Sequence, residues 1–205
     1  FLDKEPDTEL TLEMVFNDKT RTMGWLANVY SDIPDPYMGY ARFLGWDILG
    51  DDMTPSERWR QWNWKVIPYL LGEWTPTSDW DGNYWASLPQ RIREANIFIE
   101  NVHALPDQGI SNQEVEYMKA ECQCMIAYYY WLLAETYGPV PFSPAKADAS
   151  ASYAELMLGQ SPFDEIVQWI DTELLDIAKE LPAFYTNNNK FGRATSVMCY
   201  AVRAR

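Results

Sequence analysis

The stretch SNQEVEYMKAECQCMIAYYYWLLAETYGP, residues 111–139, decides the fold class of this chain. Its mostly apolar positions recur in steps of three and four, a spacing that places them along one side of an α-helix. Those positions are Val115, Met118, Cys122, Met125, Tyr129, Leu132 and Thr136. Ser111 and Glu114 form a capping box at the start, and Gly138-Pro139 ends the helix. The last turns are aromatic on nearly every side, so we expect burial on several sides.

Two helices are expected before this one. The first runs from residue 8 to 33, where the IPDP run at 33–36 stops it. Its helical spacing relates Phe16, Met23, Leu26 and Tyr30. The second carries a long apolar stripe with Pro89 at its first helical position. That stripe comprises Trp85, which we place in the core, together with Leu88, Ile92, Ala95, Ile99 and Val102. Residues 37–80 show no regular pattern, which predicts long loops with short helical pieces.

Two more helices are expected after it. Ser161 caps the first of them, Pro162 takes its first helical position, and Pro182 stops it. Its buried face is predicted to be Phe163, Ile166, Ile170, Leu174, Ile177 and Leu181. Thr195 caps a last helix that is unfinished at Arg205, so we expect a longer protein and an exposed apolar face formed by Val197, Met198 and Ala201. No strand-like alternation persists, so the sequence predicts an all-α chain of stacked helical hairpins.

Charge and composition exclude several classes of function. The 205 residues are 47% hydrophobic and carry a net charge of −14, which argues against binding to nucleic acid or to an anionic membrane surface. His103 is the only histidine, so no histidine-based metal or catalytic cluster is possible. The three cysteines lack the spacing of a disulfide framework, and we interpret Cys122, Cys124 and Cys199 as buried free thiols.

The stretch EWTPTSDWDGNYW, residues 73–85, places three tryptophans among residues typical of loops. A flat indole can cover the apolar C–H face of a sugar ring, while neighbouring carboxylates, amides and guanidinium groups bind its hydroxyls. This chemistry makes Trp74 and Trp80 candidate stacking platforms. Asp51, Asp52, Asn83 and Arg58 are the candidate polar partners.

Five segments in this order resemble the N-terminal half of the SusD/RagB family of outer-membrane nutrient-binding lipoproteins of Bacteroidetes. They are FLDKEP at 1–6, REANIFIENV at 93–102, AYYYWLLAETYGPVPF at 127–142, SPFDEIVQWIDTEL at 161–174 and FGRATSVMCYAVRAR at 191–205. The chain departs from the family pattern at two places. One is Gly159-Gln160, where many relatives have an arginine, and the other is the pair of cysteines at 122 and 124.

The resemblance implies tetratricopeptide-like (TPR-like) helical hairpins that carry Trp-rich, ligand-binding loops. It implies that residues 1–205 are the N-terminal part of the protein and that a C-terminal half is absent here. It further implies a lipid anchor on a cysteine upstream of Phe1, exposure at the cell surface, and a role as the lid of a SusC-like TonB-dependent transporter. In relatives a Trp-x-Pro loop lines the glycan site, which matches Trp74 with Pro76, and an upstream acidic pair matches Asp51 and Asp52.

Other functions are compatible with the same residues. Paired carboxylates beside tryptophans also occur in glycoside hydrolases, although we expect no enzyme, no cofactor and no metal here. Asp47, Asp51 and Asp52 could bind calcium, but they lack the glycine-spaced loop of known sites. A peptide ligand, or an interaction scaffold without a small ligand, are the remaining alternatives to a glycan.

Overall fold

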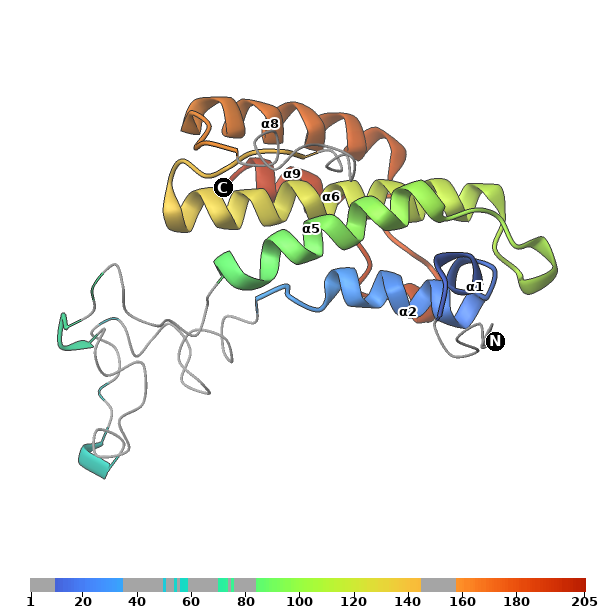
Figure 1. The fold of residues 1–205 in the computed structure, drawn as a ribbon, viewed down its shortest axis with the longest axis horizontal. Coiled ribbons are helices and arrows are strands. Elements are labelled where there is room, and N and C mark those ends of the chain that lie inside the picture. The colour runs from blue at the N-terminus through green and yellow to red at the C-terminus, as the bar shows by residue number, and fades with distance from the viewer. Residues whose placement is uncertain are drawn as a thin grey trace, which may run out of the picture. The chain divides into compact units, whose positions relative to one another are not determined.

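The computed structural model of the chain is helical (Figure 1) and describes residues 10–34, 50, 54, 56–58, 70–73, 75, 84–144 and 158–205. In these ranges the β-structure consists of two isolated bridges, Leu105–Ile110 and Pro141–Gln160. The helices are α1 (Leu12–Phe16), α2 (Lys19–Tyr30), α5 (Tyr84–Asn101), α6 (Asn112–Tyr137), α8 (Phe163–Glu180) and α9 (Ser196–Arg203). Short 3₁₀ turns span Pro106–Gln108 and Asn188–Lys190. The all-α prediction is confirmed.

The chain divides into two compact units. The first combines Phe1–Ser31 with Leu88–Arg205, and the second is the inserted segment Asp32–Ser87. In the first unit α6 packs against α8 and α2, and α8 packs in turn against α9. Figure 1 shows α5 and α6 running antiparallel, and α8 running antiparallel to α6. This arrangement is the predicted stack of helical hairpins.

Helix α6 is the centre of the first unit, as its sequence predicts. It begins after Ser111, whose Oγ accepts a hydrogen bond from the Glu114 N–H at 3.2 Å, and it ends at Gly138, whose φ is 71°. Tyr129 is fully buried, and its hydroxyl donates to the Val29 carbonyl of α2. Burial extends around most of the helix, so many residues outside the predicted stripe are buried as well.

The single helix expected over residues 8–33 is wrong, because two helices occupy this segment. Thr11 caps α1 through the Met14 N–H, and Asp18 caps α2 through the Arg21 N–H. An Asp side chain that satisfies the first turn of a new helix competes with continuation of the old one. Asp18 was therefore a helix-start signal inside the apolar pattern.

Two expectations for α5 are also wrong. The helix begins at Tyr84, so Pro89 lies inside it and not at its first position. Trp85 is 51% exposed, whereas Tyr84, one residue earlier, is buried. The buried stripe continues through Leu88, Ile92, Ala95, Phe98 and Val102. Successive helical residues differ in direction by about 100°, so a one-residue difference is enough to bring the indole out of the core.

Helix α8 keeps its predicted inner face but not its predicted start. Pro162 has ψ 138° and is the N-cap itself, without a side-chain capping bond, so Ser161 is not the cap. Phe163 is 39% exposed and lies outside the core. The remaining predicted residues, Ile166, Ile170, Leu174, Ile177 and Leu181, are all buried.

Helix α9 starts after Thr195, as predicted, although the Thr195 side chain makes no capping bond. Cys199 faces inward and is buried, while Val197 is 60% and Tyr200 50% exposed. Ala201 is exposed and Met198 is half-buried. The exposed apolar face is therefore confirmed for Val197 and Ala201, and it includes Tyr200. None of the described helices is long and apolar enough to cross a membrane.

Candidate functional site

The six predicted ligand-binding residues all fall in the segment Asp32–Ser87. Asp51, Asp52, Trp74, Trp80 and Asn83 lie outside the described residues, so their mutual arrangement stays a prediction. Arg58 lies within the described residues and is exposed. The described residues instead define the parts of the first unit that precede and follow this segment in the chain.

The segment follows the C-terminus of α2, and α2 is hydrogen-bonded to α5. The Trp25 Nε1–H donates to the Glu94 carbonyl at 3.0 Å, and the Asn28 amide donates to the Glu94 carboxylate at 2.8 Å. Arg91 forms an ion pair with the same carboxylate. After the segment, the chain continues along α5. There Leu88 is fully buried, and the Asn96 amide donates to the Pro144 carbonyl at 3.1 Å. The stretches of the first unit that flank the segment are thus bonded to other elements of that unit.

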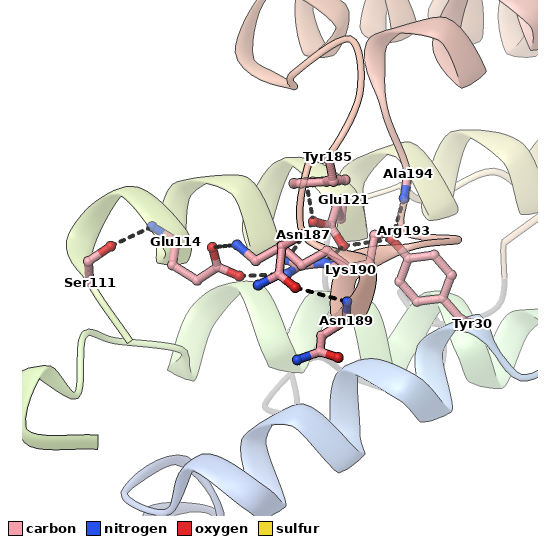
Figure 2. Close-up of polar contacts among 10 residues, drawn as sticks. All are labelled: Tyr30, Ser111, Glu114, Glu121, Tyr185, Asn187, Asn189, Lys190, Arg193 and Ala194. Atoms are coloured by element: carbon pink, nitrogen blue, oxygen red, sulfur yellow. Dashed lines mark hydrogen bonds and ion pairs between the residues drawn. The ribbon is translucent and has the colours of Figure 1, made fainter. Parts of the chain in front are cut away.

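The last residue of α2, Tyr30, enters a buried charge cluster around Glu121 of α6 (Figure 2). Glu121 is 0% exposed, and its carboxylate accepts from the Tyr30 hydroxyl at 2.7 Å and from the Tyr185 hydroxyl at 2.8 Å. Arg193 donates from Nε at 2.9 Å, and its Nη2 lies 2.6 Å from the other carboxylate oxygen. The buried charge is therefore both paired and hydrogen-bonded, as burial of a carboxylate requires.

A second carboxylate, Glu114, lies about two turns before Glu121 on α6. Arg193 Nη1 donates to it at 2.5 Å, and Lys190 forms an ion pair with its other oxygen. The Glu114 side chain is 17% exposed. Its backbone N–H donates to the Ser111 side chain, as the predicted cap requires, whereas its carboxylate binds the cations of the cluster.

The electrostatics of the cluster favour one protonation state. Burial and the negative charge of Glu121 raise the pKa of Tyr30 far above its ordinary value, and the same two causes raise the pKa of Tyr185. Both hydroxyls consequently remain donors. Burial alone would lower the pKa of Arg193, but its bonds to Glu121 and Glu114 outweigh that effect and raise it. Burial alone would likewise raise the pKa of Glu114, but Arg193 and Lys190 hold it below its ordinary value.

The Gly-Arg-Ala-Thr motif, residues 192–195, leads from this cluster to the start of α9. Gly192 has φ 88°, a conformation that a side chain would strain, and it precedes the inward-pointing Arg193. The Ala194 methyl is buried, while its N–H donates to the Tyr30 hydroxyl at 3.0 Å. Thr195 then stands at the N-cap of α9. The motif connects α9, α6 and the end of α2.

This cluster has a structural role, and its buried carboxylate is not accessible to a substrate. The Glu121 carboxylate faces four donor atoms and has no exposed surface on which a substrate could approach it. Within the described ranges no group of three or more His, Cys, Asp or Glu is placed to hold a metal. Sequence reasoning missed the cluster, although a Glu at 121 among apolar helix positions is a signal for a buried charge that needs a partner.

The comparisons with known proteins agree with the fold. The sequence model of a SusD-like family, described as "Starch-binding associating with outer membrane", matches residues 1–205. No curated protein is significantly similar to the chain.

Among solved structures, the protein named BT4246 is 29% identical and superposes with a TM-score of 0.67 over 91% of this chain and 30% of its own. A SusD-like protein from Bacteroides fragilis, BF3747, is 19% identical with a TM-score of 0.72, covering 94% of this chain and 35% of its own. Surface glycan-binding protein A from Bacteroides uniformis is 20% identical with a TM-score of 0.65, covering 91% and 41%.

The chain thus spans 30% to 41% of the length of these three structures. The family match covers the whole sequence, and the structural matches share its TPR-like helical architecture. The segments that carry the resemblance, above all the aromatic helix α6 and the Gly-Arg-Ala-Thr motif, form the core of that architecture in this structure. The chain belongs to the SusD-like family of starch-binding, outer-membrane-associated proteins.

Proposed function

We propose that this protein binds a glycan at the cell surface and delivers it to a SusC-like TonB-dependent transporter, for which it acts as a lid. The observation that carries the proposal is the family match over residues 1–205, whose description names starch binding and the outer membrane. A similar solved structure is named as a surface glycan-binding protein, which supports the same class of ligand.

The binding residues that we propose are the indoles of Trp74 and Trp80 with the polar groups of Asp51, Asp52, Asn83 and Arg58. A sugar ring offers an apolar face and a rim of hydroxyls, so a site of this composition matches both parts. A rigid aromatic platform also loses little conformational entropy on binding. The net charge of −14 suits a neutral oligosaccharide better than an acidic one.

The first unit supports this role by the way it anchors the candidate segment. Tyr30, Asn28 and Trp25 bind the last turns of α2, which precede the segment, to α5 and α6. Leu88, the first residue after the segment, is fully buried. Binding loops work best on a scaffold that does not move when the ligand binds. The buried cluster around Glu121 contributes that rigidity.

The proposed activity is binding without catalysis. The family is described by binding, and the two carboxylates of the cluster, Glu114 and Glu121, are paired with Arg193 and Lys190. We further propose that the protein is held at the outer membrane by a lipid on a cysteine upstream of Phe1 and is exposed at the cell surface. The transporter would lie beneath it.

Calorimetric titration of the full-length protein with a panel of neutral oligosaccharides tests the ligand class. Trp74→Ala should weaken binding by about 1–3 kcal/mol, as loss of an aromatic hot spot does, with little change in melting temperature. Trp74→Phe is the matched control, because it keeps a flat ring and should retain much of the affinity. Binding of peptides instead of glycans, or release of shortened sugars on long incubation, would contradict the proposal. If Trp74→Ala binds with the same affinity as the parent protein, Trp74 is not part of the binding site.

A further inference from the structure

A pair of buried thiols lies between two helices that are far apart in the sequence. The Sγ atoms of Cys124 in α6 and Cys199 in α9 are 3.6 Å apart and within hydrogen-bonding reach of each other, across a separation of 75 residues. Both side chains are 0% exposed. The sequence separation and the odd number of cysteines hid this pairing, which only the packing of α9 on the scaffold produces.

We propose that Cys124 and Cys199 are joined by a disulfide bond in the exported protein, and that this bond clamps α9 to α6. A disulfide places its sulfurs about 2.05 Å apart, so the two Sγ atoms must approach each other by about 1.5 Å. Rotation of the two side chains, together with a small shift of the eight-residue helix α9, covers a movement of this size. The inference rests on the outer-membrane location of the family, because disulfides persist in the periplasm and at the cell surface.

The third cysteine is excluded by its position on α6. Cys122 precedes Cys124 by two residues, so the two side chains leave the helix in different directions. Cys122 is buried on the side of Glu121 and Arg193. Burial and the charge of Glu121 raise the pKa of Cys122 well above its ordinary value, although Arg193 opposes this in part.

The bond forms by two exchange steps with a disulfide-bearing oxidant of the export pathway. The Cys124 thiolate attacks one sulfur of that oxidant, which forms a mixed disulfide and releases the other oxidant sulfur as a thiolate. The Cys199 thiolate then attacks Cys124 Sγ, which forms the internal bond and releases the second oxidant thiolate. Two protons leave the protein thiols, and the oxidant, now a dithiol, has gained two electrons.

The structure also indicates the order of events. Because both sulfurs are buried in the folded protein, the mixed disulfide must form before α9 docks. Docking then brings Cys199 to Cys124.

Peptide mapping of the protein isolated from the bacterial outer membrane tests the proposal. The protein is denatured in the presence of iodoacetamide without reductant and digested with trypsin. We expect one disulfide-linked species that joins residues 120–146 to residues 194–203, with the carbamidomethyl group on Cys122. Reduction before alkylation should separate the two peptides. Alkylated Cys124 and Cys199 in the unreduced sample would overturn the proposal.

Matched variants assign the link within the first peptide. Cys122→Ser should keep the linked species, whereas Cys124→Ser and Cys124→Ala should both abolish it. A link that survives in the Cys124 variants would assign the bond to Cys122 and overturn the proposal. Reductant should lower the melting temperature of the parent and of Cys122→Ser by several degrees, because the bond restrains the unfolded chain. Mapping does not depend on ligand binding, so a protein that binds no glycan would still give a clear result.

Discussion

Arg193 is the residue whose removal should most damage this fold without opening an apolar cavity. Its guanidinium contacts Glu121 through Nε and Nη2 and Glu114 through Nη1, and its side chain is 11% exposed. Arg193→Met keeps much of the apolar stem but leaves the fully buried Glu121 carboxylate without a cation. Breaking a buried pair in this way costs about 3–5 kcal/mol. For a chain of this size, each kcal/mol lowers the melting temperature by about 2–4 °C, so we expect a loss of about 6–20 °C.

The assay is urea denaturation at pH 7, followed by the helical circular dichroism signal, with the slope of the transition checked for constancy. Arg203→Met is the matched control, because Arg203 pairs with the 55% exposed Asp171 and surface pairs contribute about 1 kcal/mol or less. In the double variant Arg193→Met with Glu121→Gln, the uncompensated charge is gone while an acceptor for Tyr30 and Tyr185 remains. The double variant should recover at least about 1 kcal/mol relative to the sum of the single variants. Strictly additive losses, or a loss for Arg193→Met no larger than for Arg203→Met, would refute the reasoning.

Three further predictions concern separate parts of the structure. Tyr129→Ala removes a fully buried ring from α6 and should cost about 3–5 kcal/mol in unfolding free energy; near-parental stability would contradict that burial. Because the folded pKa of Glu114 is depressed, its contribution is present above its unfolded pKa and lost as pH falls through the folded value. Glu114→Gln should therefore lose less stability than the parent between pH 7 and pH 3 in thermal melts, and equal losses would argue against the effect. Val197→Ser should change the stability of residues 1–205 by less than about 0.5 kcal/mol, but should destabilise the full-length protein more if the rest of the chain covers this face; equal melting shifts in both would contradict that cover.

Some helix bounds and buried faces follow from the local sequence pattern, and others do not. The bounds of α6 and the inner face of α8 were predicted because spacing, caps and glycine or proline stops act within a few residues of each other. The break between α1 and α2 was missed because the apolar spacing continues across Asp18, and the capping role of that side chain shows only in its bond to Arg21. Trp85 was placed in the core because it lies at the edge of the stripe, where a one-residue difference decides exposure.

The ligand-binding residues were inferred from composition and resemblance, and the described residues test none of their contacts. Loop side chains follow no periodic rule, so sequence spacing does not determine whether Trp74 and Trp80 face the same ligand. The structure shows that α2, which precedes their segment, is hydrogen-bonded to α5, and that Leu88, which follows the segment, is buried.

The sequence by itself determined the helical class, the central place of α6 and the membership of a known family, because these depend on local spacing and on ordered motifs. Only the tertiary structure decided the partners of the buried charges and thiols. Glu114 reads locally as part of a helix cap, yet its carboxylate binds Lys190 and Arg193, which lie 76 and 79 residues away. Cys124 and Cys199 meet only because α9 packs against the scaffold. Such contacts join residues that no local period relates, and they form only when hydrophobic burial has brought the helices together.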